Sequence, residues 1–136
     1  MKRTASAHWE GDLKTGKGTL STQSTVLDKS QYSFGTRFEN GKGTNPEELL
    51  GAAHAGCFTM ATGHALSQAG FIPTSLDTVA TITLEGTTVT GSHLEIKGKV
   101  PNISKEKFEE IVKDAEKNCI ISRALSVPIT STITLL

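Results

Sequence analysis

The chain has 136 residues, a length that suits one domain. Hydrophobic residues make up only 36% of it, with one Trp, one Tyr and five Phe, so we expect part of the apolar surface to be buried against another subunit. The 14 basic residues balance the 14 acidic ones, and no Lys/Arg block stands out. This balance argues against nucleic acid or an anionic membrane as the main partner, since both need a concentrated positive surface.

Three strands are predicted in the N-terminal part, within residues 4–10, 17–27 and 31–38, and together they form an antiparallel sheet. The third of them, QYSFGTRF, alternates aromatic and polar side chains. This alternation places Arg37 on the face opposite to Tyr32, Phe34 and Phe38.

A long central helix is predicted over residues 46–69. Thr44 or Asn45 can cap it, Pro46 fits its first position, and Gly70 is a natural stop. Apolar and small side chains lie on every side of this helix, and such a helix is normally buried all round. Its glycines each weaken it by about 1 kcal/mol relative to alanine, which indicates that another backbone approaches closely.

The C-terminal part, residues 76–136, is predicted to form a second sheet and a helix. Two strands span residues 76–85 and 92–100, and Ser104 caps an amphipathic helix. The closing strand, SVPITSTITLL, carries Pro128 near its start, which predicts that the strand either lies at a sheet edge or begins late. The predicted elements are therefore an N-terminal sheet, a long central helix and a C-terminal sheet with a helix, in a single domain, residues 1–136.

The compartment predicted for this chain is the cytoplasm. The N-terminus has a basic start but lacks the apolar region of a signal peptide, and no segment is apolar enough to span a membrane. In a reducing compartment, the two cysteines, Cys57 and Cys119, are better explained as free, metal-bound or redox-active than as a structural disulfide.

The two thiols allow several interpretations. Buried cysteines that pack as small hydrophobic residues are as well supported by their number alone as a redox pair. A metal site would use His54 and Cys57, which share one helix face, but His64 lies too far along the axis and no CxxC or HExxH motif supplies further ligands. We therefore favour satisfied or exposed histidines over a metal site.

A reactive thiolate needs a positive partner, because burial in apolar surroundings opposes its ionisation. Arg37 is the candidate cation, although a solvated surface arginine is the commoner situation. If Arg37 faces the central helix, Glu47 or Glu48 at the start of that helix would hold it.

The segments AHWEGDLKTGKGTLST and TRFENGKGTNPEELLGAAHAGCF, with a second cysteine after the penultimate helix, resemble the OsmC/Ohr family of osmotically inducible and organic hydroperoxide resistance proteins. The resemblance covers essentially the whole chain. It is closer to the OsmC branch, because the candidate arginine lies in TRF and not near the N-terminus.

The resemblance implies a thiol-dependent peroxidase with an α+β fold, in which antiparallel sheets surround a long central helix and two chains form an intertwined homodimer. Cys57 would be the peroxidatic thiolate, Cys119 the resolving thiol, Arg37 the group that stabilises the thiolate, and Glu47 the group that orients Arg37. Many relatives have proline directly after the second cysteine, whereas this chain has Ile120, which bears on the placement of Cys119.

The implied reaction reduces an organic hydroperoxide through a Cys57 sulfenic acid and a Cys57–Cys119 disulfide, which an external dithiol then reduces. The resemblance suggests lipoyl-bearing proteins as that reductant, and no metal, flavin or heme is required. Apolar side chains near the thiol, such as Leu50, Phe58 and Met60, would favour organic hydroperoxides. The alternatives are a non-enzymatic redox sensor or binding protein, and a structural dimer with inert thiols.

The spacing of Glu47 and Cys57 adds an expectation about the dimer. Ten residues of helix rise about 15 Å, too far for Glu47 to organise Arg37 beside the Cys57 of a straight helix. Either the helix bends at its glycines or Glu47 serves the other subunit's thiol, and we favour the second.

Overall fold

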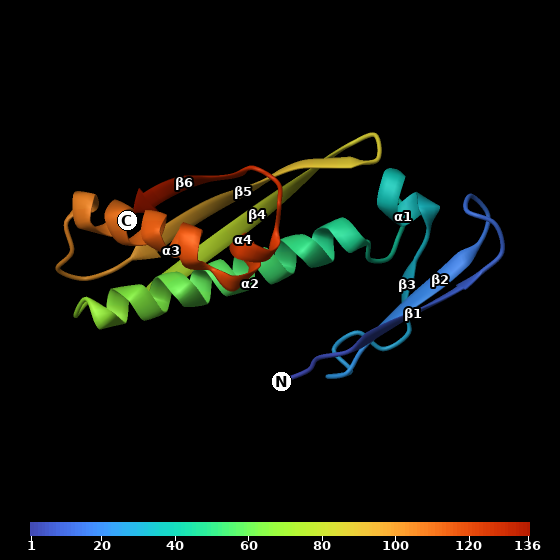
Figure 1. The fold of residues 1–136 in the computed structure, drawn as a ribbon, viewed down its shortest axis with the longest axis horizontal. Coiled ribbons are helices and arrows are strands. Elements are labelled where there is room, and N and C mark those ends of the chain that lie inside the picture. Colours follow the sequence, from blue (N-terminus) through green and yellow to red (C-terminus); the bar gives the residue numbers. More distant parts are fainter. The chain divides into compact units, whose positions relative to one another are not determined.

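The computed structural model describes residues 1–136, which divide into two compact units, Met1–Leu49 and Leu50–Leu136 (Figure 1). The prediction of a single domain stays a prediction. No helix in the structure combines the length and the apolar character that a membrane crossing requires.

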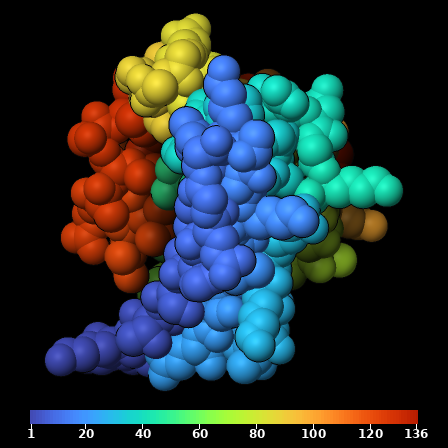
Figure 2. Space-filling model, turned by 90° about the vertical axis from the view of Figure 1, so that its right-hand side faces the viewer, coloured from blue at the N-terminus to red at the C-terminus, as the bar shows by residue number.

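The first unit contains the predicted antiparallel sheet, with strands β1 (Ala5–Glu10), β2 (Lys17–Thr22) and β3 (Ser30–Tyr32) in the order β1-β2-β3. Figure 2 shows this unit, with the first residues of the chain (dark blue) extending beyond the sheet. Trp9 and Tyr32 flank Gly18 in the register and pack over it, so that a Cβ at Gly18 would lie 2.5 Å from atoms of both rings.

The prediction of a strand over residues 31–38 is wrong beyond Tyr32, because α1 (Phe34–Phe38) is a short helix. Ser33 caps it: the Ser33 hydroxyl accepts from the Thr36 N–H, and the Thr36 hydroxyl accepts from the Ser33 N–H. Phe34 and Phe38 share one face of a strand and, four residues apart, also share one face of a helix. The aromatic pattern therefore did not distinguish the two, and the cap decided the conformation.

Helix α2 (Pro46–Gln68) agrees closely with the predicted central helix. The Asn45 side-chain oxygen accepts from the Glu48 N–H at 2.8 Å, and Gly70 has the positive φ of +89° expected just beyond a helix C-terminus. The helix begins in the first unit and continues through the second.

The second unit is built on the sheet β4-β5-β6, with β4 (Ser75–Glu85), β5 (Thr88–Lys99) and β6 (Ile129–Leu135). Helices α3 (Lys105–Asn118) and α4 (Ile120–Ala124) lie between β5 and β6 in the chain. As predicted, the Ser104 hydroxyl caps α3, and Pro128 precedes a strand at the sheet edge.

The predicted α+β class is confirmed, but the second sheet is mixed and not antiparallel throughout as predicted. β4 and β5 pair antiparallel through a tight turn, whereas β5 and β6 pair parallel. A parallel neighbour needs a crossover connection, and α3 with α4 provides it.

The core of the second unit lies between one face of this sheet and the helices (Figure 1). Its fully buried apolar side chains come from α2, β5 and α3: Phe58, Leu66, Leu94, Ile96, Phe108 and Val112. Gly98 on β5 makes room for the Phe108 ring, since a Cβ there would lie 2.4 Å from it. This close contact holds α3 against the sheet.

The prediction that α2 is buried all round is wrong for a single chain. Its buried residues lie on one side, and the opposite side is exposed. We call that side the open face of α2, formed by Ala52, Ala53, Gly56, Met60, His64 and Ser67. Met60 is 79% exposed and no atom lies within 4 Å of a Cβ built on Gly56, so the rest of the second unit does not cover this face.

Candidate active site

The structure brings the two cysteines together. Cys57 is half-buried on α2, between Gly56 of the open face and the core residue Phe58. Cys119 is 1% exposed and lies where α3 ends and α4 begins. Both thiols are free, and hydrogen bonding between them affects the pKa of each. The two thiols are therefore close enough in space for each to influence the ionisation of the other.

The two thiols differ in acidity. Burial raises the pKa of Cys57, hydrogen bonding to Cys119 raises it further, and the N–H groups of Ile121 and Ile120 offset this only in part. Burial also opposes ionisation of Cys119, but the neighbouring polar groups of Ser122 and the Cys57 thiol outweigh it and lower the pKa of Cys119. A thiolate at Cys57 therefore needs a positive charge from elsewhere.

Ile120, where the family resemblance leads us to expect proline, is the first residue of α4 and is 68% exposed. Proline would fit this first helical position, but it has no N–H. Burial keeps the pKa of Cys57 raised, and the Ile120 N–H, which proline would lack, opposes this only slightly. Cys119 is nevertheless held in place, since its N–H donates to the Ala115 carbonyl at 2.9 Å.

Arg37 and Glu47 form an ion pair within the first unit. Arg37 lies in the last turn of α1 and Glu47 in the first turn of α2, and the Arg37 Nε and Nη2 atoms donate to Glu47 Oε1 at 2.9 and 2.8 Å. Arg37 stays 44% exposed, while Glu47 Oε2 is buried without a hydrogen-bond partner. Glu48, the other candidate acid, instead accepts from the Thr44 hydroxyl.

An apolar hollow of about 290 Å³ adjoins Arg37 in the same unit. It is lined by Trp9, Leu13, Tyr32, Ser33, Phe34, Arg37 and Phe38. This hollow was not predicted from the sequence. Its four aromatic residues are more than half of the seven aromatic residues in the chain, and their concentration before residue 40 was the signal that could have indicated it.

Two of the apolar residues that were expected beside the Cys57 thiol lie in different surroundings. Phe58 is fully buried in the core and Met60 lies on the open face of α2. Phe58 therefore cannot contact a substrate in this structure.

His54 is fully buried one turn before Cys57 on α2, and both of its ring nitrogens are hydrogen-bonded to serine hydroxyls. The histidine is therefore satisfied, as favoured from the sequence. His64 is exposed, and no group of three or more potential ligands is arranged to hold a metal ion.

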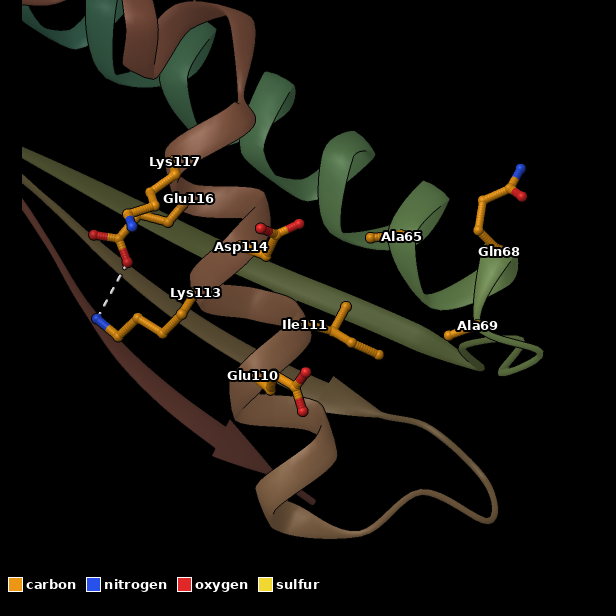
Figure 3. Close-up of a pocket in the computed structure, with 9 residues that line it drawn as sticks. All are labelled: Ala65, Gln68, Ala69, Glu110, Ile111, Lys113, Asp114, Glu116 and Lys117. Carbon is orange, nitrogen blue, oxygen red and sulfur yellow. Dashed lines mark hydrogen bonds and ion pairs between the residues drawn. The ribbon is translucent and has the colours of Figure 1, made fainter.

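A larger cleft, of about 820 Å³, lies between the C-terminal part of α2 and α3 (Figure 3). Ala65, Gln68 and Ala69 line it on the α2 side, and mostly charged side chains line it on the α3 side, where Lys113 pairs with Glu116 at 3.2 Å. It contains no cysteine or histidine, so we place the candidate active site at the paired thiols and not in this cleft.

The chain is similar to known proteins in both sequence and fold. Residues 39–134 match the family described as OsmC-like protein. The chain is 48% identical over 134 residues to the Peroxiredoxin OsmC of Escherichia coli (strain K12), a match that covers 96% of this chain and 94% of the relative.

Two solved structures share the fold. The organic hydroperoxide resistance protein OhrB of Bacillus subtilis has a TM-score of 0.71 at 21% identity, covering 98% of both chains. An OsmC-like protein of unknown function from Vibrio cholerae has a TM-score of 0.72 at 15% identity, covering 98% of this chain and 99% of the other.

Proposed function

This chain belongs to the OsmC-like protein family, and we infer that it is a thiol-dependent peroxidase that reduces organic hydroperoxides to alcohols. The observation that carries the inference is the pair of adjacent free thiols, Cys57 and Cys119, in a chain 48% identical to a peroxiredoxin.

The proposed cycle begins with attack of the Cys57 thiolate on the distal oxygen of ROOH. The O–O bond breaks, ROH leaves, and Cys57 becomes a sulfenic acid. Cys119 then attacks the Cys57 sulfur, which forms the disulfide and releases water. An external dithiol reduces the disulfide by exchange, and a lipoyl-bearing protein is the proposed source. A reducing compartment such as the cytoplasm would sustain this last step.

Arg37 is proposed to supply the positive charge that the Cys57 thiolate needs, with Glu47 as the group that orients it. Three observations support this: the pKa of Cys57 is raised within one chain, the ion pair holds the guanidinium in a defined orientation, and Arg37 remains partly exposed. The aromatic hollow beside Arg37 would receive the organic part of the substrate.

The Arg37–Glu47 pair is proposed to act on the thiol of a second copy of the chain. Glu47 and Cys57 belong to one continuous helix, whose rise separates them by about 15 Å. The open face of α2 carries the small residues that let a second helix approach, and Cys57 lies at its border. An antiparallel pair of α2 helices that sets Glu47 level with the partner's thiol has its two-fold axis beside Ala52, midway between positions 47 and 57.

This geometry predicts that Ala52→Cys forms an intermolecular disulfide. In a background of Cys57→Ser and Cys119→Ser, the two introduced thiols would face each other at the axis, within the short Cα separation that a disulfide requires. Mild oxidation should convert most of the protein to a covalent dimer on non-reducing electrophoresis.

Ser67→Cys in the same background is the matched control, because it lies on the same face but about 22 Å along the helix from Ala52. It should stay monomeric on the same gel. Equal crosslinking of both variants would show random collision, and no crosslinking at Ala52 would rule out this packing.

A turnover assay tests the function itself. With a dithiol in excess, the reduced protein should consume many equivalents of cumene hydroperoxide, and its kcat/KM should exceed that for hydrogen peroxide about tenfold or more, because only the organic substrate buries apolar surface. A sensor would be oxidised once per chain without rapid turnover, and a structural dimer would keep both thiols reduced. Either result would overturn the peroxidase assignment.

A further inference from the structure

A fully buried histidine ties three elements of the second unit together. His54 on α2 is 0% exposed, its Nδ1 atom lies 2.7 Å from Ser92 Oγ on β5, and its Nε2 atom lies 2.8 Å from Ser122 Oγ on α4. Ser92 is 2% exposed and Ser122 is 7% exposed. We call these three side chains the histidine cluster, and it is a direct hydrogen-bonded link between the core and α4.

The ring of His54 is neutral in the folded chain near neutral pH. Burial lowers the pKa of His54, because a charged imidazole loses its hydration there, and Glu116 on α3 opposes this. The Glu116 carboxylate is already bound by the Lys113 ammonium at 3.2 Å and the Ser131 hydroxyl at 2.8 Å, so it is not free to pair with the ring. A neutral ring has one N–H, so one of its nitrogens donates to a serine and the other accepts from one.

The other elements around the ring supply no counter-charge for a protonated form. On β5, His93 and Glu95 lie on the sheet face opposite to the helices. On α4, Arg123 is exposed and has the same sign of charge as a protonated imidazole. Cys57 and Cys119 carry no negative charge when acid protonates their thiols. Protonation would therefore leave an unpaired charge in the core, which is strongly unfavourable.

We propose that the histidine cluster is a pH-sensitive switch, which holds residues 119–124 on the core while His54 is neutral and releases them in acid. α4 has five residues, and its N-cap residue Cys119 makes no side-chain hydrogen bond to it, so few interactions of its own stabilise this helix. Release lets water reach the ring, and an imidazole in water takes up a proton at about pH 6.5. The proton stabilises only the released form, so the contact weakens as the pH falls below about 6.5.

Chemical labelling of Cys119 measures the release, because this residue is 1% exposed and a reagent reaches its sulfur only when residues 119–124 open. The reagent is dithiodipyridine, applied to a Cys57→Ser background that has no other thiol. At each pH, the labelling rate is divided by the rate for the same chain unfolded in urea, which gives the opening constant. Between about pH 7.5 and about pH 5, this constant should rise about tenfold or more, as expected when opening lets one imidazole bind a proton. The measurement needs no hydroperoxide, so it is independent of the proposed peroxidase function.

His54→Gln removes the titrating group and keeps a donor and an acceptor for the two serines, so its opening constant should change less than about twofold over the same range. His64→Gln is the matched control, because His64 is an exposed histidine of the same helix, and this variant should keep the full rise. Ser122→Ala removes the α4 side of the cluster and should raise the opening constant about tenfold already at about pH 7.5. An opening constant of the parent chain that does not change with pH, an equal rise in His54→Gln, or no increase in Ser122→Ala would overturn the proposal.

Low concentrations of urea separate the release of α4 from unfolding of the whole second unit. The dependence of an opening reaction on urea scales with the surface that it exposes, and release of a short segment exposes little. At about pH 5, the opening constant should therefore depend on urea less than about half as steeply as global unfolding followed by circular dichroism. Equal steepness would show that Cys119 is labelled only in the unfolded chain, and it would overturn the switch.

Discussion

Cys57→Ser should abolish hydroperoxide reduction, with a loss of at least about 10³-fold in kcat/KM, because a serine hydroxyl is not ionised at neutral pH and cannot accept the peroxide oxygen. The measurement is consumption of cumene hydroperoxide in the presence of a dithiol. The change exchanges sulfur for oxygen at a half-buried position, so the thermal stability should change little. Peroxide consumption at the wild-type rate would exclude Cys57 as the nucleophile.

Cys119→Ser is the informative partner of that variant. Cys57 should still react with one equivalent of hydroperoxide per chain, but its sulfenic acid has no neighbouring thiol to close on. A diketone reagent specific for sulfenic acids should label this variant after oxidation and should not label the wild type. Multiple turnovers at the wild-type rate would show that Cys119 is not the resolving thiol.

The second large effect is expected from a heterodimer of two inactive chains. Arg37→Ala should lower kcat/KM about 10²-fold, because the opposite charge that favours the Cys57 thiolate is lost. If Arg37 acts across the two-fold axis, one protomer with Arg37→Ala and one with Cys57→Ser together contain one complete site. The purified heterodimer, isolated through two different tags, should recover about half of the wild-type activity.

The alternative gives the opposite result. If Arg37 acts on the thiol of its own chain, the same heterodimer contains no complete site and stays inactive. Arg3→Ala is the control for a general charge effect, since Arg3 is exposed near the N-terminus, and this variant should keep wild-type activity. A heterodimer without activity, beside an active Arg3→Ala variant, would overturn the proposed sharing of the site.

The elements predicted well from the sequence are those whose signals are local. Asn45 and Gly70 delimit α2, and Ser104 and the apolar spacing of Phe108, Ile111 and Val112 define α3. The end of the third strand was mispredicted because Phe34 and Phe38 fit two periodicities, and a capping box decided between them. The parallel pairing of β6 was also missed, since strand direction depends on a partner distant in the sequence.

The candidate site shows the same difference between local sequence signals and contacts between residues that are distant in the sequence. The sequence by itself determined the residue types: two thiols in the chain, an arginine that Glu47 or Glu48 could hold, and a long helix rich in small residues. These are properties of composition, caps and spacing, which do not depend on the rest of the fold.

Only the tertiary structure decided which groups meet. The crossover through α3 and α4 carries Cys119 to Cys57, and it also places Ser122 against a histidine that β5 binds from the other side. In the first unit, the fold pairs Arg37 with Glu47 and not with Glu48. In the second unit, one face of α2 is left uncovered by the sheet and the other helices. The physical reason is that thiol acidity, hydrogen bonding and burial depend on neighbours in space, which residue spacing along one chain does not specify.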